Sequence, residues 1–271
     1  MASPLDVAAP DPAVVLCDLD GVIWLAHVPI PGSVEAVARL RAQGRRVLFV
    51  TNNSSAVVAV QEQALAAIGI PAVGDVLTSA TAAAALVHAG ERVLVCGGPG
   101  VREAVTARGA TPVAGDDAAG VDVDAVVVGF HREFDYERMR IAATAVRRGA
   151  RLIATNDDAT YPTPDGPIPG GGAILASIAT ATGTQPDVAG KPYDAMATAV
   201  TTLLGPLEGS LLMVGDRAST DGAFAVTMGC PFALVRSGVT RRGDEVGVPV
   251  AIDAADLAAV VDALAPRRAA R

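Results

Sequence analysis

The sequence has 271 residues, of which 51% are hydrophobic and only 3% aromatic, and its formal net charge is −8. This hydrophobic content is sufficient for a sizeable core in one large domain or two small ones. The net negative charge argues against a nucleic-acid partner, because binding to the phosphate backbone needs clustered Lys and Arg.

The apolar residues and the cysteines indicate the architecture and the compartment. Most apolar residues are small or branched aliphatics, which favours a parallel α/β sheet covered by helices on both faces. Cys17, Cys96 and Cys230 are far apart and adjoin apolar runs, so we expect three buried thiols and no zinc framework. No signal peptide is visible, and no apolar run reaches the roughly 18 residues of a membrane-spanning helix. We therefore expect a cytoplasmic protein with no membrane partner.

Strand and helix patterns alternate along the chain, which is typical of an α/β fold. The predicted strands are residues 14–17, 46–50, 75–77, 92–96, 125–128, 151–154, 211–214 and 232–235. The predicted helices are residues 34–42, 56–68, 79–89, 101–108, 136–148, 173–181, 193–204, 223–228 and 257–264. Residues 24–32 predict a small hairpin or flap over the end of the first strand, and Ser33 is the predicted cap of the helix that follows.

The first strand ends in two carboxylates. Asp18, Asp20 and Gly21 directly follow the apolar residues 14–17. In an open α/β sheet the carboxyl ends of the strands border the ligand crevice. The two aspartates would repel each other unless a cation or a shared proton lies between them, so the pair indicates a metal site. The alternative is a plain turn, in which aspartate caps the backbone and the glycine takes a positive φ.

A cluster of short polar residues, Thr51 to Ser55, follows the second strand. As structure, Ser54 or Ser55 caps the next helix and the asparagines close the turn. As chemistry, a hydroxyl and backbone N–H groups at a strand end and a helix N-terminus bind phosphate. Both interpretations can hold together, because capping needs only one of the five residues.

Two glycine-rich segments differ in what they indicate. Residues 155–172 form a long loop rich in proline and polar groups, and such loops are usually functional or flexible. Its final glycines, 170–172, precede a predicted helix and could offer backbone N–H groups to an anion. Gly97, Gly98 and Gly100 resemble half of a dinucleotide-binding fingerprint but lack its full spacing, so we discount that function.

The last third of the chain carries one lysine and two aspartates of interest. Lys191 lies between a glycine and a proline, where the simplest interpretation is an exposed residue in a turn, although lysine is scarce in this arginine-rich chain. Asp216 follows the predicted strand 211–214 and repeats the pattern of the first strand. Asp221 begins the next helix and could simply cap it.

Four motifs in this order resemble the signature motifs of the haloacid dehalogenase superfamily. They are Asp18-x-Asp20-Gly21-Val22, Thr51-Asn52-Asn53, Gly190-Lys191-Pro192 and Gly215-Asp216-Arg217-x-x-Thr220-Asp221. The chain looks like the NagD-type, nitrophenylphosphatase-like branch, which inserts an α/β cap between the second and third motifs. The resemblance implies a Rossmann-like, doubly wound parallel sheet in a core of residues 1–79 and 187–271, with a smaller α/β cap at residues 80–186.

The resemblance also implies a magnesium-dependent phosphatase and a role for each motif residue. Asp18 would be the nucleophile that forms an aspartyl-phosphate, and Asp20 would act as acid and then base. The residues that would bind the phosphoryl oxygens are Thr51, Asn52, Asn53 and Lys191. The residues that would hold Mg²⁺ are Asp18, Asp20 through its backbone carbonyl, and Asp216, and Asp221 would orient these ligands.

The substrate follows less directly from the motifs. By resemblance, the cap residues that would contact the leaving group are Asn156, Asp158, Tyr161 and Gly171. The expected substrate is a small phosphorylated metabolite, such as phosphoglycolate, glycerol phosphate, pyridoxal phosphate, a sugar phosphate or nitrophenyl phosphate. Cap-mediated dimers are common among such enzymes, so a homodimer through the cap is one assembly that the resemblance implies. The alternatives are a phosphomutase-type phosphoryl transferase, a phospho-acceptor signalling domain and a non-catalytic binding protein.

Overall fold

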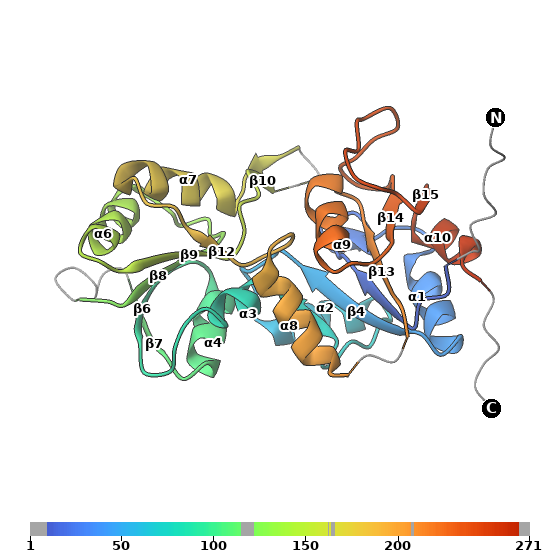
Figure 1. The fold of residues 1–271 in the computed structure, drawn as a ribbon, viewed down its shortest axis with the longest axis horizontal. Helices are drawn as coiled ribbons and strands as arrows, with labels where there is room; N and C mark the ends of the chain where they lie inside the picture. Colours follow the sequence, from blue (N-terminus) through green and yellow to red (C-terminus); the bar gives the residue numbers. More distant parts are fainter. Residues whose placement is uncertain (1–9, 115–121, 162, 164–165, 207–208, 266–271) are drawn as a thin grey trace. The chain divides into compact units, whose positions relative to one another are not determined.

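The structure is a computed structural model that describes residues 10–114, 122–161, 163, 166–206 and 209–265. Strands and helices alternate along the chain, as Figure 1 shows. Contacts between residues divide the chain into two compact units. The first unit comprises residues 1–49, 68–70 and 206–271, and the second comprises residues 50–67 and 71–205.

A parallel sheet forms the centre of the first unit. The strands of this sheet that begin in the first unit lie side by side in the order β15 (Ile252–Ala254), β14 (Phe232–Val235), β13 (Leu211–Gly215), β1 (Val14–Cys17) and β4 (Arg46–Thr51), of which β4 leaves the unit after Phe49. Cys17 pairs with Val214 on one side and with Phe49 on the other. Because the strands are parallel, the carboxyl ends of β1 and β13 lie next to each other at one edge of the sheet.

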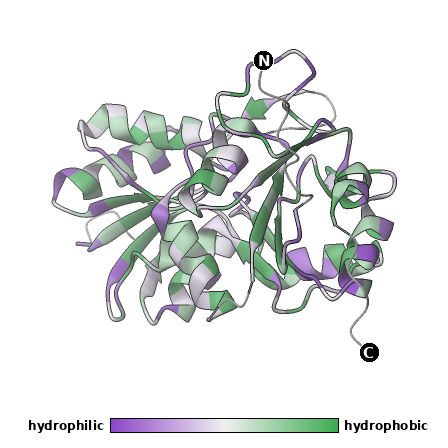
Figure 2. Cartoon of the chain, turned by 45° about the vertical axis from the view of Figure 1, so that its right-hand side comes forward, coloured by the Kyte–Doolittle hydropathy of each residue, from purple (hydrophilic) through white to green (hydrophobic). Residues whose placement is uncertain are grey.

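Short helices and one hairpin complete the first unit. The hairpin consists of β2 (Trp24–Leu25) and β3 (Val28–Pro29), which confirms the flap predicted for residues 24–32. The helical elements are α1 (Ser33–Ala42), the π-helical turn η1 (Ala218–Gly222), α9 (Ala223–Thr227) and α10 (Leu257–Ala263). In Figure 2 the strands are coloured as hydrophobic, and β1 has no residue more than 6% exposed. Hydrophobic burial therefore fixes the strands whose ends carry the acidic motifs of the sequence.

A second parallel sheet forms the centre of the second unit. Its strand order is β12 (Asp187–Val188), β9 (Arg151–Ala154), β8 (Ala125–Val128), β6 (Arg92–Cys96) and β7 (Thr111–Val113). One face of this sheet packs against α6 (Tyr136–Arg147) and α7 (Gly171–Thr182), with Val126, Ile141 and Ile178 among the buried contacts. The other elements are α2 (Val58–Ala67), β5 (Val76–Thr78), α3 (Ser79–Ala84), α4 (Pro99–Ala107), the hairpin of β10 (Thr160–Tyr161) and β11 (Ile168–Pro169), and α8 (Asp194–Leu204).

These two sheets confirm the predicted α/β class with Rossmann-like parallel sheets. The core and cap boundaries at residues 80 and 186 stay a prediction. Among the described residues, no helix combines the length and the apolar character that crossing a membrane requires.

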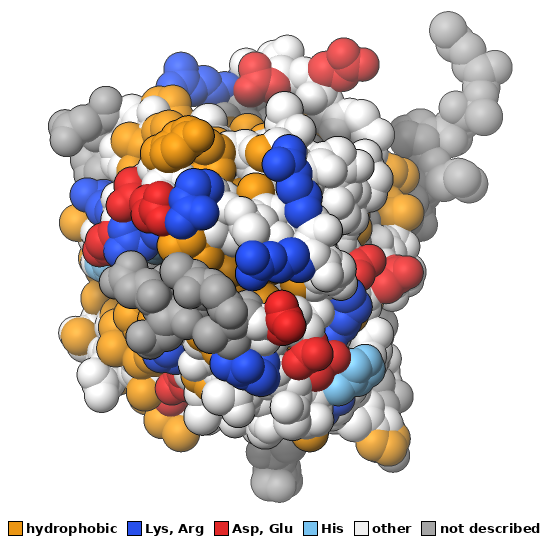
Figure 3. Space-filling model, turned by 90° about the vertical axis from the view of Figure 1, so that its left-hand side faces the viewer, with side chains coloured by type: hydrophobic (Ala, Val, Ile, Leu, Met, Phe, Trp, Pro, Cys, Tyr) orange, Lys and Arg blue, Asp and Glu red, His pale blue; other side chains and the backbone are white. Residues whose placement is uncertain are grey.

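On the face drawn in Figure 3, basic side chains are interspersed with acidic ones. Two ion pairs of α6, Arg138 with Asp135 and Arg140 with Glu137, show the same balance of charge.

Each predicted strand is present, with ends shifted by no more than one residue. Helix α3 is shorter than predicted: it ends at Ala84, and Leu86 and Val87 make turn-type hydrogen bonds to residues three positions earlier. The strands β7, β12 and β15 were not predicted. Each has only two or three residues and includes a proline or an aspartate, so it carries no recognisable alternation.

Both predicted serine caps are wrong. The Ser33 hydroxyl donates to the carbonyl of Ile23 at 2.8 Å, and Gly32 in the left-handed conformation precedes α1 instead. At α2, the Val58 N–H donates to Glu103 Oε2 at 3.0 Å, so neither Ser54 nor Ser55 is needed as its cap. The predicted turn at the asparagines is confirmed, since the Ser55 N–H donates to Asn53 Oδ1 at 3.1 Å.

The cysteines are free thiols, and Cys17 and Cys96 are buried, whereas Cys230 is only partly buried. Burial raises the pKa of the Cys96 thiol to about 12 and that of Cys230 to about 11. The expectation of three buried thiols therefore holds for two of them.

The buried Cys96 thiol makes the free energy of unfolding depend on pH in the alkaline range. The unfolded chain ionises this thiol near pH 9, whereas the folded protein keeps it protonated up to about pH 12. The contribution of this thiol to the free energy of unfolding is therefore fully present below pH 9 and is lost as the pH rises towards 12. Above pH 9 we expect the free energy of unfolding to fall in the wild type by about 1 kcal/mol per pH unit more than it falls in Cys96→Ala. Urea unfolding at pH 8, 9 and 10 measures this difference, and parallel curves would contradict it.

Candidate functional site

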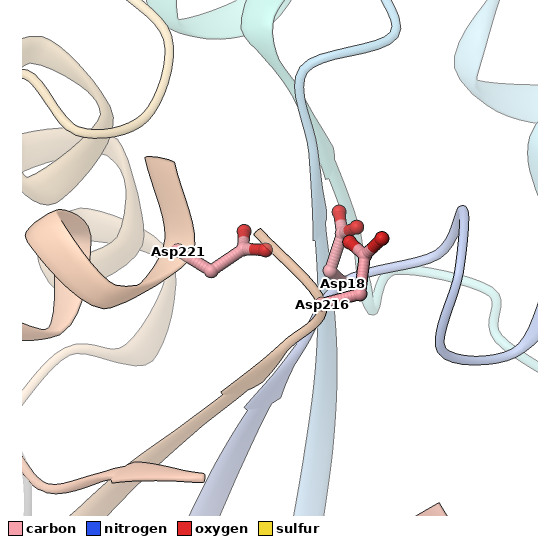
Figure 4. Close-up of side chains that lie close together, drawn as sticks. All are labelled: Asp18, Asp216 and Asp221. Carbon is pink, nitrogen blue, oxygen red and sulfur yellow. The ribbon is translucent and has the colours of Figure 1, made fainter. Parts of the chain in front are cut away.

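Three buried aspartates meet at the carboxyl ends of β1 and β13. Asp18 follows β1, Asp216 follows β13, and Asp221 lies in η1, with exposed fractions of 8%, 3% and 1%. One carboxylate oxygen from each lies within 4.8 Å of the others. In Figure 4 the Asp18 and Asp216 side chains stand together at the strand ends, and Asp221 points towards them from the neighbouring helical turn. The prediction that Asp18 and Asp216 lie at strand ends is confirmed.

Main-chain groups orient two of these carboxylates. The Val239 N–H donates to Asp216 Oδ2 at 2.5 Å, and the Arg217 N–H donates to Asp221 Oδ2 at 3.0 Å. The interpretation of Asp221 as a cap of α9 is wrong, because Gly222 precedes that helix and no side chain caps it. The Asp221 carboxylate is instead held beside the other two aspartates.

Glycines make room for the aspartates. A Cβ atom added to Gly21 would lie 2.4 Å from Asp216 Oδ2, and one added to Gly238 would lie 1.9 Å from the same oxygen. A Cβ atom on Gly215 would lie 2.2 Å from the Cβ atom of Asp221. Real Cβ atoms do not approach other atoms so closely, so these positions need glycine. Gly21 also has φ 87°, a left-handed conformation that glycine favours.

Asp20 lies in the turn between β1 and the hairpin and forms an isolated bridge with Trp24. It is partly buried, and it is not one of the three aspartates whose oxygens converge. The two carboxylates of the motif Asp18-x-Asp20 therefore lie in different places. That of Asp18 lies beside Asp216 and Asp221, and that of Asp20 lies in the turn that follows.

A polar cluster in the second unit contains the predicted phosphate-binding residues. Thr51, at the end of β4, is only 2% exposed, and its hydroxyl accepts a hydrogen bond from the Asn53 N–H at 3.0 Å. The Asn52 amide bonds to Asp158 and to the main chain of Lys191. The Asn53 amide donates to the Tyr161 hydroxyl at 3.4 Å. The structure thus brings residues from three distant segments of the sequence together within this unit.

Lys191 is buried, at 2% exposed, so its interpretation as an exposed lysine in a turn is wrong. It is the only lysine among the 271 residues. Burial of a lysine is costly unless its ammonium group is compensated. This cost is compatible with a functional role for the residue.

The loop residues predicted to select the substrate differ in their surroundings. Asn156 is 4% exposed: its Nδ2 donates to the Asn52 carbonyl at 2.8 Å, and its Oδ1 accepts from the Asp158 N–H at 3.1 Å. Tyr161 is partly buried and stacks on Phe130, with ring centroids 5.2 Å apart. Gly171 opens α7 and lies against Asn156. Asn156 therefore holds the loop through hydrogen bonds, whereas the Tyr161 ring packs against Phe130.

Of the three glycines at the end of this loop, Gly170 and Gly172 use their N–H groups within the protein and so have none to offer to an anion, whereas an anion contact of Gly171 stays a prediction. The N–H groups of Gly170 and Gly172 donate to the carbonyls of Ala159 and Asp158, both at 2.9 Å. Pro162, Pro164 and Asp165, also in this loop, lie outside the described residues.

Comparison with known proteins identifies the family. Residues 15–111 match the family described as haloacid dehalogenase-like hydrolase, and residues 188–265 match a second HAD-hydrolase-like description. The 5'-nucleotidase YutF of Bacillus subtilis is 35% identical over 84% of this chain and 88% of its own length. The chain belongs to the haloacid dehalogenase family of hydrolases.

Other relatives place this haloacid dehalogenase-family protein in the NagD-type branch. The D-glycerol 3-phosphate phosphatase of Mycobacterium tuberculosis is 38% identical over 86% of this chain and 65% of its own length. The p-nitrophenyl phosphatase of Archaeoglobus fulgidus has a TM-score of 0.85 and 32% identity, covering 94% of this chain and all of that one. A glycerol phosphate phosphatase from Mycobacterium tuberculosis, solved in complex with magnesium, has a TM-score of 0.83 and 35% identity, covering 93% and 77%.

The acidic cluster of this family member fits a hard divalent cation. Three carboxylates whose oxygens approach within 4.8 Å in a buried site repel one another. A cation between them would offset this repulsion, and carboxylate oxygens are the ligands that Mg²⁺ prefers. No histidine or cysteine belongs to the cluster, which argues against zinc. The chemistry of the donors therefore fits Mg²⁺.

The loop after β14, residues 237–240, belongs to the site but was not predicted from the sequence. The Ser237 hydroxyl donates to the carbonyl of Gly21 at 2.6 Å, and the Thr240 N–H donates to the carbonyl of Asp216 at 3.1 Å. The bonds from Val239 and Thr240 hold Asp216 in place, and Gly238 leaves room for its carboxylate. The one signal in the sequence is position: the loop follows the strand beside β13, at the same edge of the sheet.

We expect Gly238→Ala to distort the acidic cluster. The added methyl group would overlap Asp216 Oδ2 and lower the free energy of unfolding by about 1–3 kcal/mol. In an Asp216→Gly background the obstructing side chain is absent, so the same substitution should cost much less. Urea unfolding of the four proteins in this cycle measures the coupling. An equal cost in both backgrounds would contradict the contact.

Proposed function

We propose that the protein is a Mg²⁺-dependent phosphatase that hydrolyses small phosphate monoesters through an aspartyl-phosphate. The observation that carries the proposal is the convergence of Asp18, Asp216 and Asp221 at the ends of neighbouring strands. Relatives across most of the chain are named phosphatases or a nucleotidase, which supports the same reaction class.

In the first half-reaction, an oxygen of the Asp18 carboxylate attacks phosphorus. The bond from phosphorus to the leaving oxygen breaks, and its electron pair stays on that oxygen, which takes a proton from the Asp20 carboxyl group. The products are an alcohol and a phosphorylated Asp18. The position of Asp20 in the turn directly after Asp18 supports its role as the acid.

In the second half-reaction, water attacks the phosphorus of the phosphorylated Asp18 and gives its proton to the Asp20 carboxylate. The bond between phosphorus and the Asp18 oxygen breaks. Inorganic phosphate leaves, and the Asp18 carboxylate and the Asp20 acid are restored. No oxidant, reductant or further co-reactant is needed.

The residues that hold the cation in this proposal are Asp18, Asp20 through its carbonyl, and Asp216. Asp221 orients the site, because its carboxylate lies beside the others and is fixed by the Arg217 N–H. When bound, the cation withdraws negative charge from the phosphoryl oxygens and so lets a carboxylate approach them. Thr51, Asn53, Lys191 and the main-chain N–H of Asn52 bind those oxygens in our proposal.

We also propose a cap at residues 80–186 and substrate selection by this cap. Asp158 and Tyr161 are the candidates that remain partly exposed, whereas Asn156 is buried and hydrogen-bonded within the protein. A homodimer through the cap, a cytoplasmic location and a small phosphorylated metabolite as partner complete the proposal. The free state of all three cysteines suits a reducing compartment.

A panel of phosphorylated metabolites and nitrophenyl phosphate, assayed with and without Mg²⁺, tests the function. We expect phosphate release that requires Mg²⁺ and stops when the metal is chelated. Transfer of the phosphoryl group to a second substrate hydroxyl would indicate a mutase instead. A long-lived phosphoaspartate without turnover would indicate a phospho-acceptor domain, and equal activity in a metal chelator would overturn the proposal.

A further inference from the structure

We propose that Asn52 is a positioning residue that clamps the main chain of Lys191, and that its side chain does not bind phosphate. The Asn52 amide makes a matched pair of hydrogen bonds with Lys191, although 139 residues separate the two. The Lys191 N–H donates to Asn52 Oδ1 at 2.8 Å, and Asn52 Nδ2 donates to the Lys191 carbonyl at 3.1 Å. The side-chain amide thus pairs with Lys191 as a neighbouring peptide group would in a sheet.

The hydrogen bonds use both donors of the Asn52 amide. Besides the Lys191 carbonyl, Nδ2 donates to Asp158 Oδ2 at 2.9 Å. An amide nitrogen has two N–H bonds, and both have acceptors inside the protein. The orientation of the amide is also fixed, because the Lys191 N–H can only donate and the two acceptors can only accept. An amide with both N–H bonds in use has none left to donate to a phosphoryl oxygen.

The clamp is itself rigidly held. The Asn52 carbonyl accepts hydrogen bonds from Asn156 Nδ2 at 2.8 Å and from the Ser79 hydroxyl at 2.7 Å. Ser79 is fully buried and Asn156 is 4% exposed. These bonds connect the end of β4, the start of α3 and the loop after β9 at one residue. The side chain that holds Lys191 therefore has little freedom to move.

The residue before Lys191 is shaped for this contact. A Cβ atom on Gly190 would lie 2.6 Å from Asn52 Oδ1 and 2.5 Å from the Thr155 carbonyl. Only glycine lets the main chain approach so closely. The Gly-Lys-Pro motif therefore supplies the space for the clamp as well as the lysine.

A fixed main chain matters because a lysine side chain has four rotatable bonds. Its ammonium group can occupy many positions unless the backbone and the surroundings restrict it. In the proposed function Lys191 binds the phosphoryl group, and a displacement of about 1 Å can cost about 100-fold in rate. The inference about activity rests on that proposed function, whereas the clamp itself does not.

The single lysine allows a direct test. Protein labelled with [¹⁵N]lysine gives one main-chain amide signal, that of Lys191. We expect this amide to exchange slowly with solvent in the wild type, and about tenfold faster or more in Asn52→Ala, which removes the acceptor. Asn52→Asp keeps the acceptor for the Lys191 N–H but places a carboxylate oxygen against Asp158 and the Lys191 carbonyl, so its exchange should be faster than in the wild type and slower than in Asn52→Ala. The buried Val127 amide in β8, measured in uniformly labelled protein, should be unchanged in all three and controls for unfolding.

Kinetics complete the test. With nitrophenyl phosphate, Asn52→Ala should lower kcat by about 100-fold, with a smaller change in KM. An unchanged Lys191 amide in Asn52→Ala would overturn the clamp. A rise in KM with unchanged kcat would indicate a phosphate ligand instead and would also overturn it. If the wild type hydrolyses no phosphate ester, the proposed function fails, and the exchange experiment still decides the clamp.

Discussion

Asp18→Asn is expected to abolish Mg²⁺-dependent phosphate release, with a loss of at least about 10⁴-fold in kcat. The substitution keeps the size of the side chain but replaces the attacking carboxylate oxygen by an amide, which is a poor nucleophile. It also removes one negative charge from three carboxylates whose oxygens lie within 4.8 Å. In a metal chelator the variant should therefore be at least as stable as the wild type.

The measurement is phosphate release from nitrophenyl phosphate, with thermal unfolding in a chelator as the control for folding. A folded variant with turnover close to the wild type would refute the assignment of Asp18 as nucleophile. A variant that is markedly less stable than the wild type in the chelator would contradict the charge repulsion on which the metal assignment depends.

The second large effect is expected for Asp216→Ala. This change removes a carboxylate that β13 and the Val239 N–H hold in place and that we propose as a metal ligand, so Mg²⁺ affinity should fall together with activity. We expect a loss of about 10³-fold at the Mg²⁺ concentration that saturates the wild type, partly recovered at higher Mg²⁺. Activity as a function of Mg²⁺ concentration, with calorimetric titration of Mg²⁺, measures both effects.

The matched control is Asp262→Asn. Asp262 is an exposed aspartate of α10 that pairs with Arg39, so its loss should change neither Mg²⁺ affinity nor turnover appreciably. Asp221→Asn should have an intermediate effect, of about 10- to 100-fold, because in our proposal that residue orients the ligands. Loss of activity in Asp216→Ala with unchanged Mg²⁺ affinity would contradict its role as a ligand.

The parts of the site that the sequence predicts are those tied to buried strands. Four apolar residues followed closely by a carboxylate occur at β1 and again at β13, and hydrophobic periodicity is the strongest local signal in a sequence. Parallel pairing then brings the two strand ends together. The positions of Asp18 and Asp216 at strand ends therefore follow from local pattern alone.

The parts that the sequence does not predict depend on contacts between distant segments. Ser33 fits the local pattern of a helix cap, but its hydroxyl bonds to Ile23 in the preceding hairpin. Asn52 fits a phosphate-binding pattern, and the sequence gives no sign that its amide also bonds to Lys191, 139 residues away. Gly238 has no local signal at all, because its importance comes from its closeness to Asp216. Local propensity is overridden by tertiary contacts in each case.

The most direct test is to look for a phosphoryl group on Asp18 during turnover. The reaction is stopped with acid within one turnover, the protein is digested, and the masses of the peptides are measured by mass spectrometry. We predict one phosphoryl group on the peptide that contains Asp18 when Mg²⁺ is present, and none in a chelator or in Asp216→Ala. Rapid phosphate release with Asp18 unmodified throughout, or with the phosphoryl group on another residue, would contradict the account.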